Sequence, residues 1–170
     1  IYPRLGEVLN WQARYMDASE TYNAMLKTAQ SHQDDIAQSR ACQGLATSLS
    51  YQGNHQVALE SAIQAEALAR NANAKMELAK ALWTQGSTRY RLGEPRAALS
   101  LGEQSLTIAT ELNNPNEMGR SLNLIGAVYY VLGQYSQAES YWENALKIFQ
   151  DLGNRQQGMD LLSNLGAIAD

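Results

Sequence analysis

The chain has 170 residues, 45% of them hydrophobic, and a formal net charge of −4. This length allows one domain with a sizeable core, and the acidic balance argues against nucleic acid as the main partner, because phosphate binding needs a basic surface. No run of about 18 apolar residues occurs, so we expect no membrane partner.

Small residues recur at intervals of 40 positions along the whole chain. One series is Gly6, Ala46, Gly86, Gly126 and Gly166, and a second is Ala18, Ala58, Ala98 and Ala138. A fixed period of this length is typical of a repeat array, in which stacked units bury a continuous apolar strip. We expect the small residues to mark places where paired helices approach to roughly 8–10 Å between axes.

The repeat predicts a single array over residues 1–170 with four helix pairs and one lone helix. Its units span approximately residues 1–33, 34–74, 75–114 and 115–154, followed by a first helix alone at 155–170. No segment carries a strand pattern worth arguing for, so we predict an all-α fold of about nine helices.

In chain order, the residues that begin and end helices support this division. Asp34 is a predicted helix start, since negative charge favours the free N–H groups there. Gly93 ends the first helix of the third unit, and Pro95 begins the second, where its missing N–H costs nothing. After the fourth unit, residues 151–157 are the predicted polar link before a last helix at residues 159–170.

The last helix carries an apolar face with no second helix to cover it. The members of this face are Leu161, Leu162, Leu165 and Ile168. Because the terminal repeat of an array usually has a polar outer face, we expect the native protein to continue beyond Asp170 and to begin before Ile1. The same face would allow self-association, either head-to-tail or two-fold.

A set of large and small residues marks the fourth unit. The set is Leu122, Ile125, Gly126, Tyr129, Gly133, Tyr135, Ala138, Trp142 and Ala145. It resembles the pattern of the tetratricopeptide repeat family, and weaker matches extend the resemblance over the chain. The family's usual period is about 34 residues, so the longer period here predicts longer helices. The resemblance implies a right-handed superhelical α-solenoid of antiparallel helix pairs, similar to arrays in bacterial signalling ATPases and transcription regulators.

In that family, the first helices of successive repeats line a concave groove that holds a protein or peptide. Carried over by register, the resemblance implies a groove lining of Arg40, Gln43, Thr47, Lys80, Trp83, Ser87, Tyr90, Arg120, Asn123 and Tyr130. Arg40, Lys80 and Arg120 form a basic row that, with the aromatic residues, predicts a partner with acidic groups or a free carboxylate. The alternative stays open, in which the basic side chains are simply solvated and the aromatics pack on neighbouring repeats.

The remaining reactive residue types stand alone. Cys42 aligns with leucines of other units, so we predict a buried apolar residue, and a single cysteine fits a reducing, cytoplasmic setting. His32 and His55 lack further ligands at metal spacing, so we expect no metal or other cofactor. Gly102 stands where other units have larger residues. That leaves open a void for a small ligand or a side chain, such as Arg89, folded over the position.

We therefore predict a non-catalytic scaffold module that binds a protein or peptide within a larger regulatory or signalling protein. An enzyme is least favoured, because no nucleophile, acid–base pair or phosphate loop stands at a persuasive spacing. Two alternatives remain open. One is a small-molecule effector-sensing domain of a transcription regulator or signalling ATPase, with the effector near Trp83, Tyr90 and Gly102. The other is a structural oligomerisation spacer.

Overall fold

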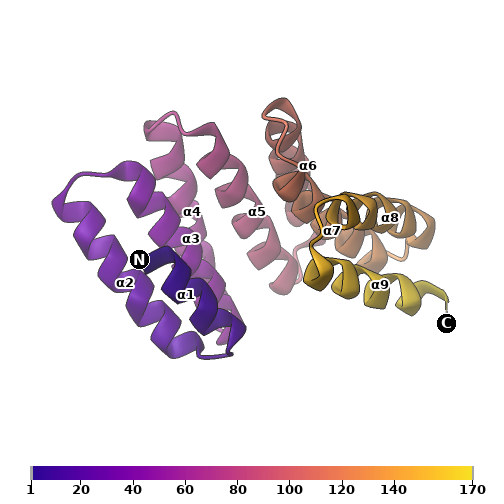
Figure 1. The fold of residues 1–170 in the computed structure, drawn as a ribbon, viewed down its shortest axis with the longest axis horizontal. Helices are drawn as coiled ribbons and strands as arrows, with labels where there is room; N and C mark the ends of the chain where they lie inside the picture. The colour runs from indigo at the N-terminus through magenta and orange to yellow at the C-terminus, as the bar shows by residue number, and fades with distance from the viewer. Residues whose placement is uncertain (1, 170) are drawn as a thin grey trace.

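The computed structural model describes residues 2–169, which form nine α-helices and contain no strand. The helices are α1 (Tyr2–Trp11), α2 (Tyr15–Ser31), α3 (Asp35–Tyr51), α4 (His55–Asn71), α5 (Lys75–Arg91), α6 (Pro95–Glu111), α7 (Pro115–Val131), α8 (Tyr135–Asp151) and α9 (Arg155–Ala169). They follow one another from one end of an elongated array to the other (Figure 1). The predicted all-α solenoid of helix pairs is confirmed.

From α2 onward the helices begin at a constant interval, which is half of the period visible in the sequence. Helices α2 to α8 each have 17 residues, and three residues separate each helix from the next. The first helices α3, α5, α7 and α9 therefore begin one full period apart, at Asp35, Lys75, Pro115 and Arg155. The connection within a pair is as short as the connection between pairs.

Each three-residue link has a residue with positive φ at its centre. These residues are Ala13, Gln33, Gly53, Asn73, Gly93, Asn113, Gly133 and Gly153. After α5, the Gly93 N–H donates to the Tyr90 carbonyl oxygen (3.1 Å), and the Glu94 N–H donates to that of Arg89 (3.0 Å). The other links repeat this pattern. It is the Schellman arrangement, which satisfies the last carbonyl groups of a helix while the chain reverses.

The predicted polar link at residues 151–157 is wrong, because the helices on both sides are longer than expected. α8 includes the first of these residues, and α9 begins at Arg155 rather than Met159. The side chain of Asn154 accepts a hydrogen bond from the Gln157 N–H at 3.3 Å. This bond satisfies one free donor of the first turn and lets the helix start directly after the link.

Two other predicted helix starts are confirmed. The Asp34 carboxylate accepts a hydrogen bond from the Ala37 N–H at 2.9 Å and so caps α3. Pro95 is the first residue of α6, where its fixed φ is compatible with the helix and no hydrogen bond is lost. Such residues define where a helix begins even though the links between helices are short.

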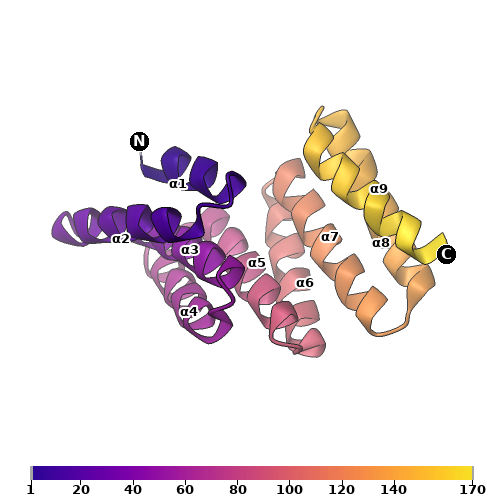
Figure 2. The ribbon, with the colours of Figure 1, turned by 90° about the horizontal axis from the view of Figure 1, so that it is seen from below.

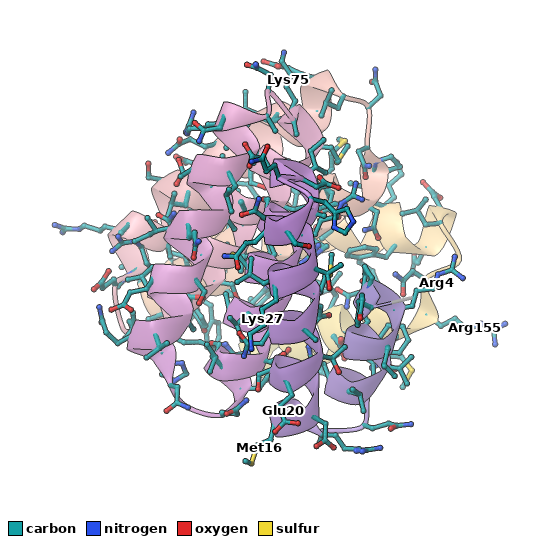
Figure 3. The ribbon with its side chains drawn as sticks, turned by 90° about the vertical axis from the view of Figure 1, so that its left-hand side faces the viewer. Arg4, Met16, Glu20, Lys27, Lys75 and Arg155 are labelled. Carbon is teal, nitrogen blue, oxygen red and sulfur yellow. The ribbon has the colours of Figure 1, made fainter. Side chains whose placement is uncertain are left out.

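The first helices of successive repeats pack on one another. α1 packs on α3, α3 on α5 and α5 on α7, whereas within residues 2–169 the second helices of successive repeats hardly touch. Since one side of the stack is more closely packed than the other, the array curves toward the first helices. We call the surface formed by α1, α3, α5 and α7 the inner face. Figure 2 shows the curved stack from below, and Figure 3, seen from the N-terminal end, shows charged side chains such as Glu20 and Lys27 on its outside.

Glycines of the first helices let aromatic rings lie directly on the backbone. A Cβ added at Gly6 would lie 2.4 Å from Cζ of Tyr22, and one at Gly126 would lie 2.6 Å from Cδ1 of Trp142. Both distances are shorter than atoms tolerate, so no side chain fits at these positions. At these two positions the small residue makes room for an aromatic ring of the second helix.

The position of Gly102 holds no void among the described residues, and Arg89 does not cover it. A Cβ at Gly102 would lie 3.1 Å from Cγ1 of Ile125 and 3.6 Å from Cδ2 of Leu124. Arg89 instead forms an ion pair with Glu94. Side chains of α7, in the next repeat, fill the space that a larger residue at this position of α6 would occupy.

The apolar face expected on the last helix is only partly uncovered. Leu161 is fully buried in a cluster with Trp142 and Phe149 of α8, so the prediction that it lacks a cover is wrong. Leu165 and Ile168 are half-buried and pack against the same cluster. Two large apolar side chains of α9 are exposed, namely Leu162 (55% exposed) and Met159 (64%).

Candidate partner-binding groove

The ten residues proposed for the groove lie on three first helices. Arg40, Gln43 and Thr47 are on α3, Lys80, Trp83, Ser87 and Tyr90 are on α5, and Arg120, Asn123 and Tyr130 are on α7. These helices pack side by side, so the residues lie along neighbouring helices, and Tyr130 contacts the Tyr135 and Trp142 rings of the second helix α8. What each side chain does there depends on its neighbours.

Two members of the basic row share one buried carboxylate. Arg40 donates to Oε1 of Glu77 from Nε (2.9 Å) and Nη2 (2.8 Å), and Nζ of Lys80 lies 3.6 Å from the same oxygen. Glu77 is only 3% exposed. The hydrogen bond to Glu77 raises the pKa of the Arg40 guanidinium above its usual value. The pair joins α3 to α5, since a buried carboxylate needs cationic partners.

The third member of the basic row is also engaged. Nη1 of Arg120 lies 3.0 Å from Oε2 of Glu117, a buried carboxylate. The Arg120 guanidinium stacks on the Trp83 ring at 3.8 Å, and Nε1 of Trp83 donates to the Arg120 carbonyl oxygen at 3.0 Å. These contacts join α5 to α7, so Arg120 and Trp83 hold neighbouring repeats together.

Sequence reasoning missed both carboxylates. Glu77 and Glu117 stand one repeat period apart, and each precedes a member of the basic row by three positions. Residues three apart share a helix face, so this spacing was a signal for internal pairing. The two carboxylates therefore offset two of the three positive charges of the row.

Other proposed groove residues make contacts between repeats or within one. Nε2 of Gln43 donates to the Glu77 carbonyl oxygen at 3.3 Å. The Asn123 carbonyl oxygen accepts from Nε1 of Trp142 at 3.1 Å, and its side-chain oxygen accepts from Asn164 at 3.4 Å. The Tyr130 ring lies 5.7 Å from that of Trp142. The inner face is thus a surface held in shape by its own polar and aromatic contacts.

A small pocket opens on the inner face between α3 and α5. Its volume is about 30 Å³, and its lining is Thr47, Ser50, Tyr51, Trp83, Thr84, Ser87, Thr88 and Arg91. Three of the predicted groove residues, Thr47, Trp83 and Ser87, meet here. Tyr51 and Arg91 were not among the predicted groove residues. They stand at the ends of α3 and α5, and only the packing of these two helices brings them together. The Arg91 guanidinium lies over the Tyr51 ring at 4.8 Å.

The single cysteine and the histidines have ordinary structural surroundings. Cys42 is fully buried, as predicted, and burial raises the pKa of its thiol to about 11. Nδ1 of His32 lies 2.8 Å from the Thr28 carbonyl oxygen, and Nδ1 of His55 lies 3.3 Å from the Ser50 hydroxyl. Within residues 2–169, no three His, Cys, Asp or Glu side chains gather as metal ligands would. Among the described helices, none combines the length and the apolar character needed to span a bilayer.

Residues 119–152, which form most of α7 and all of α8, match the family model of the tetratricopeptide repeat. The helices before and after them keep the same spacing. The chain contains a tetratricopeptide repeat. The match falls on the fourth unit, in which Gly126 lies directly against the Trp142 ring.

Solved structures share the fold of this tetratricopeptide repeat array at low sequence identity. A Rap protein complexed with Competence and Sporulation Factor aligns with a TM-score of 0.88 and 19% identity over 98% of this chain and 47% of its own. The apo form of RapI aligns with a TM-score of 0.80 and 15% identity over 94% and 58%. A signal transduction ATPase with a tetratricopeptide repeat sensor, from Pyrococcus horikoshii, aligns with a TM-score of 0.76 and 18% identity over 98% and 26%.

The array spans less than two thirds of each of these three proteins. Comparison with curated proteins found no match. The likeness therefore establishes the repeat fold, and the binding partner has to be argued from the array's own surface.

Proposed function

We propose that the array is a non-catalytic scaffold module that binds a protein or peptide on its inner face. We further propose that it serves a larger regulatory or signalling protein of the bacterial cytoplasm. The observation that carries the proposal is the inner face itself, where α3, α5 and α7 pack side by side and a pocket opens between the first two. Support also comes from the fold shared with a Rap protein bound to Competence and Sporulation Factor and with a tetratricopeptide repeat sensor.

The contacts between repeats favour binding without a large rearrangement. Arg40 with Glu77 ties α3 to α5, and Trp83 with Arg120 ties α5 to α7. A surface fixed in this way loses little conformational entropy when a partner binds, so more of the contact energy remains as affinity. The partner would meet hydroxyl, amide and aromatic groups beside the exposed part of Arg40, whose charge is already paired with Glu77.

Peptide selection on the immobilised array tests this proposal. Peptides from a displayed random library that bind the wild-type protein are measured again on Thr47→Arg, which places a long charged side chain beside the pocket. Affinity should fall by about tenfold or more, as for other residues at the centre of an interface. The matched control is Thr107→Arg, which makes the same change at an exposed position of the second helix α6.

The control variant should bind the selected peptides as the wild type does. The proposal fails if no peptide is selected. It also fails if the selected peptides bind both variants equally, because they would then lie outside the inner face. Far-ultraviolet circular dichroism of each variant separates lost binding from lost folding.

The two pockets described are smaller than the small-molecule alternative requires. Typical small-molecule sites have volumes of roughly 300–1,000 Å³. The pocket between α3 and α5 is about 30 Å³, and a hollow beside α1, which Tyr2, Met25 and His32 help to line, is about 210 Å³. The space at Gly102, where the sequence allowed an effector, is filled by α7.

The oligomerisation alternative has one specific observation in its favour. Met159 and Leu162 are exposed on α9, and a Cβ added at Gly166 would meet nothing within 4 Å. In the same register, Gly6 and Gly126 are each covered by an aromatic ring of their own second helix. We therefore keep self-association through α9 as a second candidate function.

A further inference from the structure

We propose that the pocket between α3 and α5 binds a carboxylate group of the partner, with Arg91 as its cationic ligand. This inference rests on the proposed function of the inner face. It assigns the binding of an acidic group to Arg91 instead of the basic row. It also adds Arg91, at the C-terminal end of α5, to the residues that determine specificity.

Arg91 differs from the basic row because it forms no ion pair with a carboxylate of the described residues. Arg40 and Lys80 share Glu77, and Arg120 pairs with Glu117. In contrast, the Arg91 side chain makes no ion pair or hydrogen bond with any residue in the range 2–169. The carboxylate three positions further along, that of Glu94, is taken by Arg89.

Aromatic contacts orient Arg91 and leave its N–H groups free. Its guanidinium lies over the Tyr51 ring at 4.8 Å. That ring also stacks on Tyr15, with centroids 5.0 Å apart and planes 17° apart, and is therefore fixed in place. No hydrogen bond within residues 2–169 uses the Arg91 side-chain N–H groups, which are the groups that bind a carboxylate in a fork.

One hydroxyl group of the pocket is free to donate to an anion. Thr47, Thr84 and Thr88 donate their hydroxyl hydrogens to carbonyl oxygens one turn earlier in their own helices. The Ser87 hydroxyl has no hydrogen bond within the described part of the chain, so it remains free to donate. Since no acidic side chain is among the lining residues, Arg91 and Ser87 are the pocket residues that offer free donors to an anion.

The helix ends near the pocket do not cancel this charge. Arg91 lies at the C-terminus of α5, which carries about half a negative elementary charge. The N-terminus of α6 follows after three residues and carries a partial charge of opposite sign and similar size. The full charge of the guanidinium therefore dominates the pocket.

The size of the pocket limits the ligand to a small group. A volume of about 30 Å³ has room for about two water-sized groups, which matches the two oxygens of a carboxylate. The Tyr51 and Trp83 rings beside it offer apolar area to the rest of the ligand. The chemistry fits a peptide carboxylate that stands next to an apolar group.

Titration with small probes, followed by nuclear magnetic resonance, tests the inference directly. One probe is N-acetylphenylalanine, which carries a terminal carboxylate, and the other is the α-amide of N-acetylglutamate, which carries a side-chain carboxylate. Each is compared with the analogue in which that carboxylate is an amide. At least one carboxylate probe should shift the Arg91 side-chain and Ser87 amide signals and bind about tenfold more tightly than its amide.

Substitution of Arg91 supplies the matched comparison. Arg91→Gln should reduce carboxylate binding by about tenfold and leave amide binding unchanged. Arg96→Gln, at an exposed position of α6, should change neither. The inference is overturned if the amides bind as well as the carboxylates, or if Arg91→Gln binds the carboxylates as the wild type does.

The peptides selected on the wild-type array separate this inference from the proposed function. If they lose affinity on Thr47→Arg but bind Arg91→Gln normally, the inner face binds peptides without this subsite, and the inference fails alone. If no peptide is selected at all, the proposed function fails. Binding that weakens on both variants supports both.

Discussion

Glu77 shows how one buried side chain joins two repeats. It is 3% exposed and holds both Arg40 of α3 and Lys80 of its own helix. Replacement of Glu77 by Ala should lower the free energy of unfolding by about 1–3 kcal/mol, because charge-assisted hydrogen bonds are lost. The measurement is urea denaturation followed by circular dichroism.

A double-mutant cycle isolates the contact between the repeats. Arg40 keeps about half of its side chain exposed (52%), so solvent weakens its interaction with Glu77. We expect a coupling energy between Arg40→Ala and Glu77→Ala of about 0.5–1 kcal/mol. The control is Glu60→Ala at an exposed position of α4, which should change stability by less than about 0.5 kcal/mol. Strict additivity of the two inner-face substitutions would contradict the assignment.

Replacement by alanine should have opposite effects on stability at two glycines that occupy the same position in their repeats. Gly126→Ala should destabilise the protein by about 1–3 kcal/mol, because the new Cβ would collide with Trp142. At Gly166 the same Cβ meets nothing, so the better helix propensity of alanine should stabilise α9 by up to about 1 kcal/mol. Thermal and urea denaturation of both variants measure the contrast. Equal effects would mean that ring packing does not distinguish the two positions.

The candidate site was predictable in position and less so in chemistry. Register placed Thr47, Trp83 and Ser87 on one face, and the structure brings them together in a pocket. The pairing of the basic row was not expected, because it depends on the burial of Glu77 and Glu117 between helices. Whether a charge is free or neutralised is set by its neighbours in the packed array, which register alone does not reveal.

The links are the elements on which the regular spacing depends. Gln33 has a φ of 52°, a conformation that costs a residue with a side chain roughly 1 kcal/mol or more. Gln33→Gly should therefore raise the free energy of unfolding by about 0.5–1 kcal/mol, net of the greater freedom of glycine in the unfolded chain. Conversely, Gly93→Ala should lower it by about 1 kcal/mol, since Gly93 has a φ of 77°.

The control for the links lies one turn away. Gln30→Gly changes the same residue type at an exposed helical position of α2, where glycine should destabilise by about 0.5–1 kcal/mol. The measurement is urea denaturation. If the free energy of unfolding falls with urea concentration at the same slope in each variant, the substitutions have altered only stability. If Gln33→Gly and Gln30→Gly act in the same direction, the link conformation is not the cause.

These links also explain which part of the fold was visible in the sequence. The glycines at 53, 93 and 133 mark only the turns within pairs, so the period that can be seen is that of a whole helix pair. The equivalent positions between pairs carry Gln33, Asn73, Asn113 and Gly153 in the same backbone conformation. Since three of these four residues are polar, and polar residues also stand in ordinary loops, the sequence pattern did not reveal the constant interval between single helices.

At the scale of the whole molecule, the array is held by a chain of neighbour contacts rather than by one central core. Its buried residues form separate clusters along the stack, such as the one around Tyr22 and the one around Trp142. In such an array each repeat is stabilised mainly by the next. The contacts across the inner face therefore set both the stability of the stack and the spacing of the surface that a partner meets.

The exposed face of α9 makes self-association measurable. Leu162 is 55% exposed and lies with Met159 on the side of α9 that, in other repeats, packs against a second helix. Burial of such side chains contributes about 1.5–3 kcal/mol each, so two of them support a weak dimer.

We expect concentration-dependent association of the protein in sedimentation velocity, weakened by about tenfold in Leu162→Glu. Ile63→Glu, at a 45% exposed position of α4, is the matched control and should associate as the wild type does. A protein that stays monomeric at high concentration, or two variants that behave alike, would exclude α9 as the contact and leave the inner face as the array's binding surface.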